Sequence, residues 1–255
     1  GRLERSRSAD TALTATIVCP GYAEMRELLR ASVDRSLGTS IEITRVDTRV
    51  DPDWETIDTD LVLSTIGPGR SSDRVVRMPP FLTGSDVDRI QVAAARRRRA
   101  RRLTRRRDEL SRYFSAEAFL SPLPDVGDEA IIRRLAEPLR TADLIDDAYV
   151  DRTIARERMS STAFTEALAV PHALRMTAKR TAISVGVARG SVVWGASRVQ
   201  VVALVAFSEN DRGAFQTVFE QLVEVFSEPE SAQRIVRAAT SFERFLDELV
   251  AVIDG

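Results

Sequence analysis

Two almost wholly apolar segments in the second half of the chain constrain its fold more than any other feature. Residues 181–187 and 199–207 are rich in valine, isoleucine and alanine, and strands of that composition are typical of sheets covered on both faces. A shorter strand pattern lies between them at residues 192–194. Helical spacing of apolar residues on either side predicts helices that cover the sheet, at residues 128–141, 147–159, 211–226, 228–238 and 241–253. We therefore predict an α/β fold for this half.

The first half of the chain shows a simpler alternation of strand and helix patterns. Apolar spacing within residues 24–33 predicts a helix that ends at Gly38. Short apolar runs predict strands at residues 15–18, 41–46, 61–66 and 75–78. Strands that alternate with helices favour a parallel sheet, so we predict a small α/β domain with a parallel sheet.

Length and composition limit the classes of protein to which the chain can belong. Its 255 residues suit two domains, and no apolar run approaches the roughly 20 residues of a membrane-spanning helix. The single cysteine excludes an internal disulfide framework and favours a reducing compartment. The net charge of −1 argues against a uniformly basic nucleic-acid-binding protein. We predict a cytoplasmic protein without membrane insertion.

An arginine-rich segment, residues 96–107, separates the two halves. Such a run could attract nucleic acid, but it lacks interleaved aromatic residues, so we interpret it as a solvated linker helix. The predicted organisation is a linker from an upstream region at 1–12, a first domain at 13–84, a basic helical linker at 85–116 and a second domain at 117–255.

The only histidine of the chain, His172, follows a short apolar run with the pattern of a strand. Because Pro171 cannot donate a hydrogen bond to a sheet, this strand should end there or lie at an edge. An imidazole, with an ordinary pKa of about 6.5, is largely neutral at cellular pH, and its free lone pair can attack phosphorus. A histidine with a purely structural role is the alternative.

Two residues upstream of this histidine have the chemistry to hold a phosphoryl group. The guanidinium of Arg156 has a planar fork of donors that suits phosphate oxygens, and the hydroxyl of Thr162 can donate one further hydrogen bond. We therefore treat His172, Arg156 and Thr162 as one candidate site.

The run R-E-x-x-x-S-T that begins at Arg156, followed by Ala-Val-Pro-His, resembles the phosphorylation segment of EIIA domains of the mannitol and fructose class. These domains belong to the phosphoenolpyruvate-dependent sugar phosphotransferase system. The resemblance covers residues 119–253 and implies that His172 accepts the phosphoryl group while Arg156 helps to hold it. Two positions depart from the family pattern: Thr165 stands where a glycine is frequent, and Phe215 stands where a second histidine is common.

Cys19 follows the first predicted strand and precedes a helix, at the edge of an α/β sheet where ligands bind. This half resembles EIIB domains of the same system, in which a cysteine after the first strand carries the phosphoryl group, so the resemblance makes Cys19 a candidate phosphocysteine. The usual loop is rich in glycine, whereas this chain has Tyr22, Glu24 and Met25 at positions of that pattern. A buried structural cysteine is the alternative.

The order of a parallel-sheet EIIB-like domain and an α/β EIIA-like domain resembles the C-terminal regulatory region of BglG-type and mannitol-activator-type transcriptional regulators. The resemblance implies phosphate exchange with phosphorylated HPr or a transporter EIIB domain. It also implies regulatory and nucleic-acid-binding domains upstream in the same chain, with DNA or RNA as the target. A second copy of the chain is a further candidate partner.

Two other functions stay open at this point. One is an EIIA-type phosphocarrier of a mannitol- or fructose-class transporter, and the other is an interaction domain that is never phosphorylated. The carrier would be an enzyme component that passes phosphate to an incoming sugar, whereas the regulatory region would be a phosphohistidine acceptor or phosphotransfer domain rather than a turnover enzyme. We expect no cofactor, and one histidine with one cysteine cannot assemble a usual zinc site.

Overall fold

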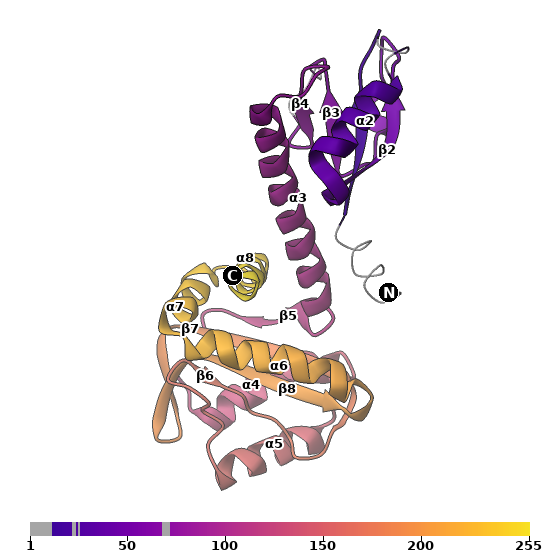
Figure 1. Ribbon diagram of the computed structural model, residues 1–255. Helices are drawn as coiled ribbons and strands as arrows, with labels where there is room; N and C mark the ends of the chain where they lie inside the picture. Colours follow the sequence, from indigo (N-terminus) through magenta and orange to yellow (C-terminus); the bar gives the residue numbers. More distant parts are fainter. Residues whose placement is uncertain (1–11, 22–23, 25, 68–71) are drawn as a thin grey trace. The chain divides into compact units, whose positions relative to one another are not determined.

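Two four-stranded sheets organise the chain, one in each of two compact units (Figure 1). The computed structural model describes residues 12–21, 24, 26–67 and 72–255. The first unit extends to Arg102 and the second begins at Leu103, so the division falls within a single helix. Nearly all of the predicted linker at residues 1–12 lies outside the described residues.

The sheet of the first unit is entirely parallel, with the strand order β2-β1-β3-β4. Its strands are β1 (Leu13–Val18), β2 (Ile41–Asp47), β3 (Leu61–Ser64) and β4 (Val75–Arg77). The predicted small parallel sheet is therefore confirmed. The chain leaves β1 for β2 on one side and reaches β3 on the other, which places the carboxyl end of β1 at the point where the strand order reverses.

Two helices cover one face of this sheet, α2 (Arg26–Leu37) and the first part of α3 (Gly84–Leu110). Leu29 and Val33 of α2 and Ile90 of α3 pack against buried residues of β1 and β3. The predicted helix end at Gly38 is confirmed, because Gly38 follows α2 with a φ of 61°. A left-handed conformation of this kind suits glycine at the end of a helix.

The arginine-rich segment is helical, as the sequence predicts, and lies in the second half of α3. Arg98 donates a hydrogen bond of 2.7 Å to the carbonyl of Ser40, and Arg101 pairs with Asp60 at 3.1 Å. Some of these arginines therefore hold α3 against the first sheet. The predicted bounds of the linker, 85 and 116, stay predictions.

The sheet of the second unit is mixed, with the strand order β5-β7-β8-β6. Its strands are β5 (Phe114–Leu120), β6 (Leu168–Ala169), β7 (Thr177–Trp194) and β8 (Ser197–Ser208). β7 and β8 are antiparallel, while the edge strands β5 and β6 run parallel to their neighbours. The two strands predicted at 181–187 and 192–194 form one long strand, whose pairing with β8 shifts register between Val187 and Val192.

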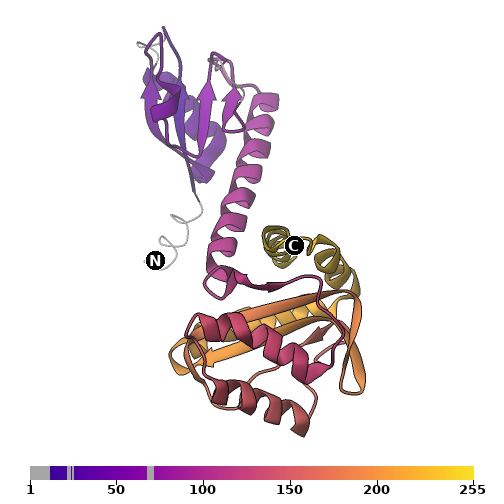
Figure 2. The same cartoon turned by 180° about the vertical axis from the view of Figure 1, so that it is seen from behind.

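Helices cover both faces of this second sheet, as the apolar strands predict. Two helices pack on one face, α4 (Asp128–Thr141) and α5 (Asp147–Met159) (Figure 2). Three helices pack on the other face, α6 (Arg212–Ser227), α7 (Pro229–Ala238) and α8 (Phe242–Asp254). Residues 201–206 of β8 are all buried, so the predicted α/β fold with a doubly covered sheet is confirmed.

Candidate functional site

His172 lies just beyond the edge strand of the second sheet. The strand β6 ends at Ala169, and the chain continues beside β8 through a hydrogen bond of 3.0 Å from the nitrogen of Val205 to the carbonyl of Pro171. His172 itself forms an isolated parallel bridge with Val205. The predicted edge position is confirmed, and the imidazole of His172 is only half-buried.

The two nitrogens of the His172 ring have different surroundings. Nδ1 lies 2.8 Å from the carbonyl oxygen of Val170. Because a carbonyl can only accept a hydrogen bond, a neutral imidazole in this position carries its proton on Nδ1 and has its lone pair on Nε2. The ring also makes an edge-to-face contact with Phe207, with 5.8 Å between the ring centres. The backbone and this ring together fix the orientation of the imidazole.

Tyr149 of α5 fixes the part of β8 that lies beside this histidine. Its hydroxyl donates to the carbonyl of Val205 at 3.2 Å and accepts from the nitrogen of Phe207 at 3.0 Å. Burial raises the pKa of the Tyr149 phenol, so the hydroxyl stays protonated at neutral pH. Helix α5 is thus attached to two residues of β8, Val205 and Phe207, that contact His172.

Arg156 lies in the last turn of the same helix and is half-buried. Its Nη1 donates a hydrogen bond of 2.7 Å to the carbonyl of Ser160. Within the described part of the chain, no hydrogen bond joins Arg156 to His172. A guanidinium has five N–H donors, so this one bond leaves others for a ligand, and the role of Arg156 stays a prediction.

Thr162 is buried and has a partner that the sequence did not indicate. Its hydroxyl donates to Glu157 Oε2 at 2.5 Å, and its backbone nitrogen donates to Glu157 Oε1 at 2.8 Å. Trp194 Nε1 also donates to Glu157 Oε1, at 2.8 Å. In this structure the hydroxyl proton of Thr162 is directed at the Glu157 carboxylate. The predicted hydrogen bond from Thr162 to a phosphoryl group stays a prediction. Sequence reasoning missed Glu157, although it follows Arg156 directly in the motif.

The position expected for a second histidine belongs to the core. Phe215 is buried and contacts Phe207 edge to face, with 5.0 Å between the ring centres. The other departure, Thr165, has a local role: its hydroxyl accepts hydrogen bonds from the nitrogens of Ala167 and Leu168. Neither side chain offers a second imidazole to a phosphoryl group.

The other candidate nucleophile, Cys19, is fully buried in the core of the first unit. Burial raises the pKa of the Cys19 thiol, and this effect exceeds the lowering by Arg26 and adds to the raising by Asp47. The thiol is therefore protonated at neutral pH, the opposite of the condition that activates a cysteine. Of the three departures in its loop, Glu24 is exposed, and Tyr22 and Met25 lie outside the described residues.

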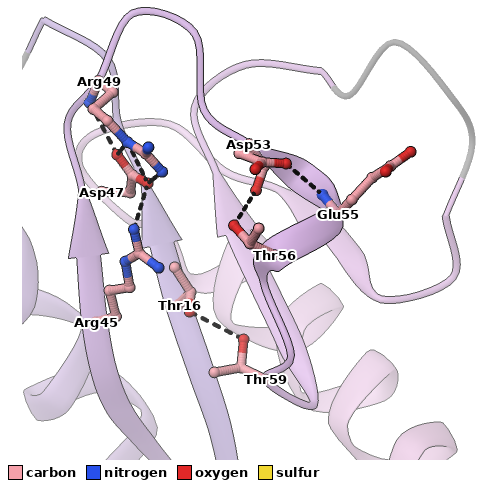
Figure 3. A network of polar contacts seen from close by, with 8 residues as sticks. All are labelled: Thr16, Arg45, Asp47, Arg49, Asp53, Glu55, Thr56 and Thr59. Carbon is pink, nitrogen blue, oxygen red and sulfur yellow. Dashed lines mark hydrogen bonds and ion pairs between the residues drawn. The ribbon is translucent and has the colours of Figure 1, made fainter.

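The carboxyl end of β2, next to Cys19, carries a compact ionic cluster (Figure 3). The carboxylate of Asp47 accepts hydrogen bonds from Arg49 at 2.6 Å and from Arg45 at 3.2 Å. The hydrogen bonds from Arg49 hold the pKa of the Asp47 carboxyl below its ordinary value. These guanidinium groups are thus engaged by a carboxylate of the protein itself.

The described parts of the chain contain neither a metal-binding cluster nor a membrane-spanning helix. Among those residues, no three or more histidine, cysteine, aspartate or glutamate side chains come together in a way that could hold a metal ion. No described helix is both long enough and apolar enough to cross a membrane.

Comparison with known protein families assigns the second unit. Residues 114–250, more than half of the chain, match the family model described as "Phosphoenolpyruvate-dependent sugar phosphotransferase system, EIIA 2". The match begins with β5 and ends within α8, so it contains the whole of the second sheet and the His172 segment.

Two curated relatives are similar to both units of the chain. The "Probable licABCH operon regulator" of Bacillus subtilis (strain 168) is 23% identical over 256 residues, which cover 99% of this chain and 37% of that protein. The "Transcriptional regulator ManR" of the same organism is 24% identical over 247 residues, which cover 95% of this chain and 38% of that protein. The chain thus spans less than two fifths of the length of these relatives.

A solved structure is similar to about half of this chain. It is the complex of enzyme IIAMTL and phosphorylated enzyme IIBMTL from Escherichia coli, and the similar chain is 20% identical with a TM-score of 0.47. The similarity covers 54% of this chain and 97% of the other.

Proposed function

Since the chain belongs to the EIIA 2 family of the phosphoenolpyruvate-dependent sugar phosphotransferase system, we propose that it is a phosphorylation-responsive regulatory region of a transcriptional regulator. His172 is its phosphoacceptor. The observation that carries this proposal is the arrangement of the imidazole, in which Nδ1 is bound to the carbonyl of Val170 and Nε2 keeps its lone pair on a half-buried ring.

The proposed step transfers one phosphoryl group without a change in protonation of His172. The lone pair of Nε2 forms a bond to phosphorus while the bond from phosphorus to the donor nitrogen or sulfur breaks, and the donor keeps that electron pair. The proton on Nδ1 stays in its hydrogen bond to Val170 throughout. The protein therefore needs no general base for this step, which suits a ring to which no carboxylate of the described residues is hydrogen-bonded.

The new phosphoryl group brings close to two negative charges, and Arg156 is the cation that we assign to them. Its guanidinium is attached to the carbonyl of Ser160 through Nη1, so the other nitrogens are the ones that would turn toward phosphate oxygens. Hydrogen bonds between charged groups contribute about 1.5–3 kcal/mol each, enough to favour a new arrangement of the chain between α5 and β6.

Regulation rather than transport is the role that the similarity of the whole chain supports. The two regulators from Bacillus subtilis align with both units, whereas the family model matches the second unit alone. Phosphorylated HPr or a transporter EIIB domain would exchange phosphate with His172 in the cytoplasm. We propose that the first unit is EIIB-like. Domains upstream of it would bind nucleic acid.

Phosphorylation in a reconstituted system tests the phosphoacceptor. The chain is incubated with phosphoenolpyruvate, enzyme I and HPr, and its intact mass is measured at neutral pH. We expect a gain of one phosphoryl group that requires every component and is absent from His172→Ala. A wild-type chain that takes up no phosphate, or a variant that still does, would contradict the proposal.

A second experiment separates a regulator from a carrier. The chain is added to an extract that lacks EIIA, and phosphorylation of sugar is followed. A regulator accepts phosphate but does not restore sugar phosphorylation, and in the full-length protein His172→Ala changes transcription of the target genes. Restored sugar phosphorylation with unchanged transcription would identify a carrier.

A further inference from the structure

A buried carboxylate lies behind the His172 segment and is connected to it by hydrogen bonds. Glu157 belongs to the last turn of α5, and only 7% of its surface is exposed. Its two oxygens accept three hydrogen bonds, two from Thr162 and one from Trp194. Trp194 is fully buried at the end of β7, so the carboxylate joins the end of a helix, a loop and the second sheet.

The hydrogen bonds continue from this carboxylate to the histidine. The carbonyl of Thr162 accepts a bond of 2.9 Å from the nitrogen of Val170, and the carbonyl of Val170 is the partner of His172 Nδ1 at 2.8 Å. An antiparallel bridge between Ala163 and Ala169 closes the same loop. The position of the Val170 carbonyl therefore depends on Thr162, and the position of Thr162 depends on Glu157.

We propose that Glu157 is a positioning residue for phosphotransfer, which holds the Val170 carbonyl in the place where it selects the Nδ1–H form of His172. This inference rests on the proposed role of His172 as phosphoacceptor. A carboxylate is acceptor-only and can serve three donors at once, whereas an alanine would leave the buried donors of Thr162 and Trp194 without a partner. In this arrangement Thr162 also acts through the loop and not by direct contact with phosphate.

The sole histidine makes the inference directly measurable. Nitrogen-15 NMR of the imidazole reports which ring nitrogen carries the proton, and His172 gives the only histidine signal. We expect the Nδ1–H form in the wild type and a mixture of both forms in Glu157→Ala. The rate of phosphate uptake from phosphorylated HPr should fall by about tenfold to a hundredfold, the usual effect of a misplaced reacting group.

Conservative and paired variants separate positioning from loss of folding. In Glu157→Gln the amide oxygen can serve both N–H donors while the amide nitrogen donates to the Thr162 hydroxyl, so the rate should stay within about threefold of the wild type. Thr162→Val should shift the imidazole signals in the same direction as Glu157→Ala. The double variant should be no slower than the slower single variant, because both residues act through one hydrogen-bonded chain. Glu224→Ala, an exposed carboxylate on α6, is the matched control and should change neither measurement.

Three results would overturn the inference. One is a folded Glu157→Ala with the wild-type imidazole signals and rate. Another is a double variant whose rate loss equals the product of the two single losses, which would indicate that Thr162 contacts phosphate independently. If Glu157→Ala does not fold, Glu157→Asp, which keeps the charge but withdraws the carboxylate by one methylene, takes its place, and unchanged imidazole signals and rate in that folded variant overturn the inference. A wild type that takes up no phosphate contradicts the proposed function instead, and the imidazole signals still decide whether Glu157 positions the ring.

Discussion

Cys19 and His172 occupy equivalent places in their two units but have opposite surroundings. Each follows a strand, near the carboxyl end of a neighbouring parallel strand. The thiol of Cys19 is fully buried among apolar residues and its pKa is raised by that burial. The imidazole of His172 is half-buried and has one nitrogen bound to a backbone carbonyl. A favourable position on a sheet is therefore not sufficient for nucleophilic chemistry.

The difference follows from what the two side chains pack against. Cys19 points into the core formed by β1, β3, α2 and α3, where a thiolate would lose its hydration. His172 lies beyond a two-residue edge strand, where one side of the ring contacts Phe207. A neutral imidazole that is bound through Nδ1 keeps a lone pair on Nε2 for attack on phosphorus. The thiol of Cys19 stays protonated, and a thiol is a much weaker nucleophile than a thiolate.

Replacement of the two candidate nucleophiles, His172 and Cys19, should give the largest contrast in phosphate uptake. His172→Ala should abolish phosphate uptake from phosphorylated HPr, because His172 is the only histidine of the sequence. Cys19→Ala should take up phosphate on His172 at the wild-type rate, since its thiol is buried in the other unit. Time courses of intact mass measure both. Loss of uptake in Cys19→Ala would remove the contrast between the two sites.

Replacement of Arg156, the cation proposed for the histidine site, should give the next largest effect. A hydrogen bond between charged groups contributes about 1.5–3 kcal/mol, so Arg156→Ala should slow phosphate uptake by roughly tenfold to a hundredfold. The rate of phosphate uptake in Arg156→Lys should lie between the rates of the wild type and Arg156→Ala, because an ammonium group keeps the charge but lacks the planar fork of donors. Arg158→Ala is the control on the same helix, as Arg158 pairs with Glu129 at the surface. An equal effect in both arginine-to-alanine variants would argue for general electrostatic attraction.

Burial of the Cys19 thiol should make the free energy of unfolding of the first unit fall as pH rises into the alkaline range. The folded pKa of Cys19 lies above its unfolded value, so the folded state retains a proton that the unfolded state releases. The contribution is fully present below the unfolded pKa of about 8.5 and is lost as pH rises toward the folded pKa. The free energy of unfolding, measured against pH, should decline more steeply in the wild type than in Cys19→Ala, by about 1.4 kcal/mol for each unit of pKa difference. Parallel curves would contradict a raised pKa.

The smallest expected effect concerns Arg26, which lowers the pKa of Cys19 from a distance. Because exposed charges contribute about 0.2–1 kcal/mol, Arg26→Ala should slow alkylation of Cys19 by iodoacetamide up to about fivefold, and less at high salt. Arg30→Ala, one turn further along α2, is the control, since Arg30 faces Asp34 at the surface. Faster alkylation in Arg26→Ala would instead point to loosening of the first unit.

Much of the fold could be predicted because its signals are local. The apolar runs of β7 and β8 and the helical spacing around them specify a sheet covered on both faces. The strand β5 was not predicted, because it is an edge strand in which buried Phe114 and Ala118 are separated by three residues that are not buried. The apolar pattern of an edge strand is weak because part of the strand stays exposed to water.

The sequence by itself determined the fold class and singled out a candidate phosphate site: one histidine after a proline at a strand end, with an arginine and a threonine in the preceding segment. Only the tertiary structure decided the partners of those groups. Glu157 meets Trp194, which lies 37 residues along the chain, and Cys19 loses contact with water. Hydrogen-bond partners and burial are set when distant segments pack, so residue types near each other in sequence cannot specify them.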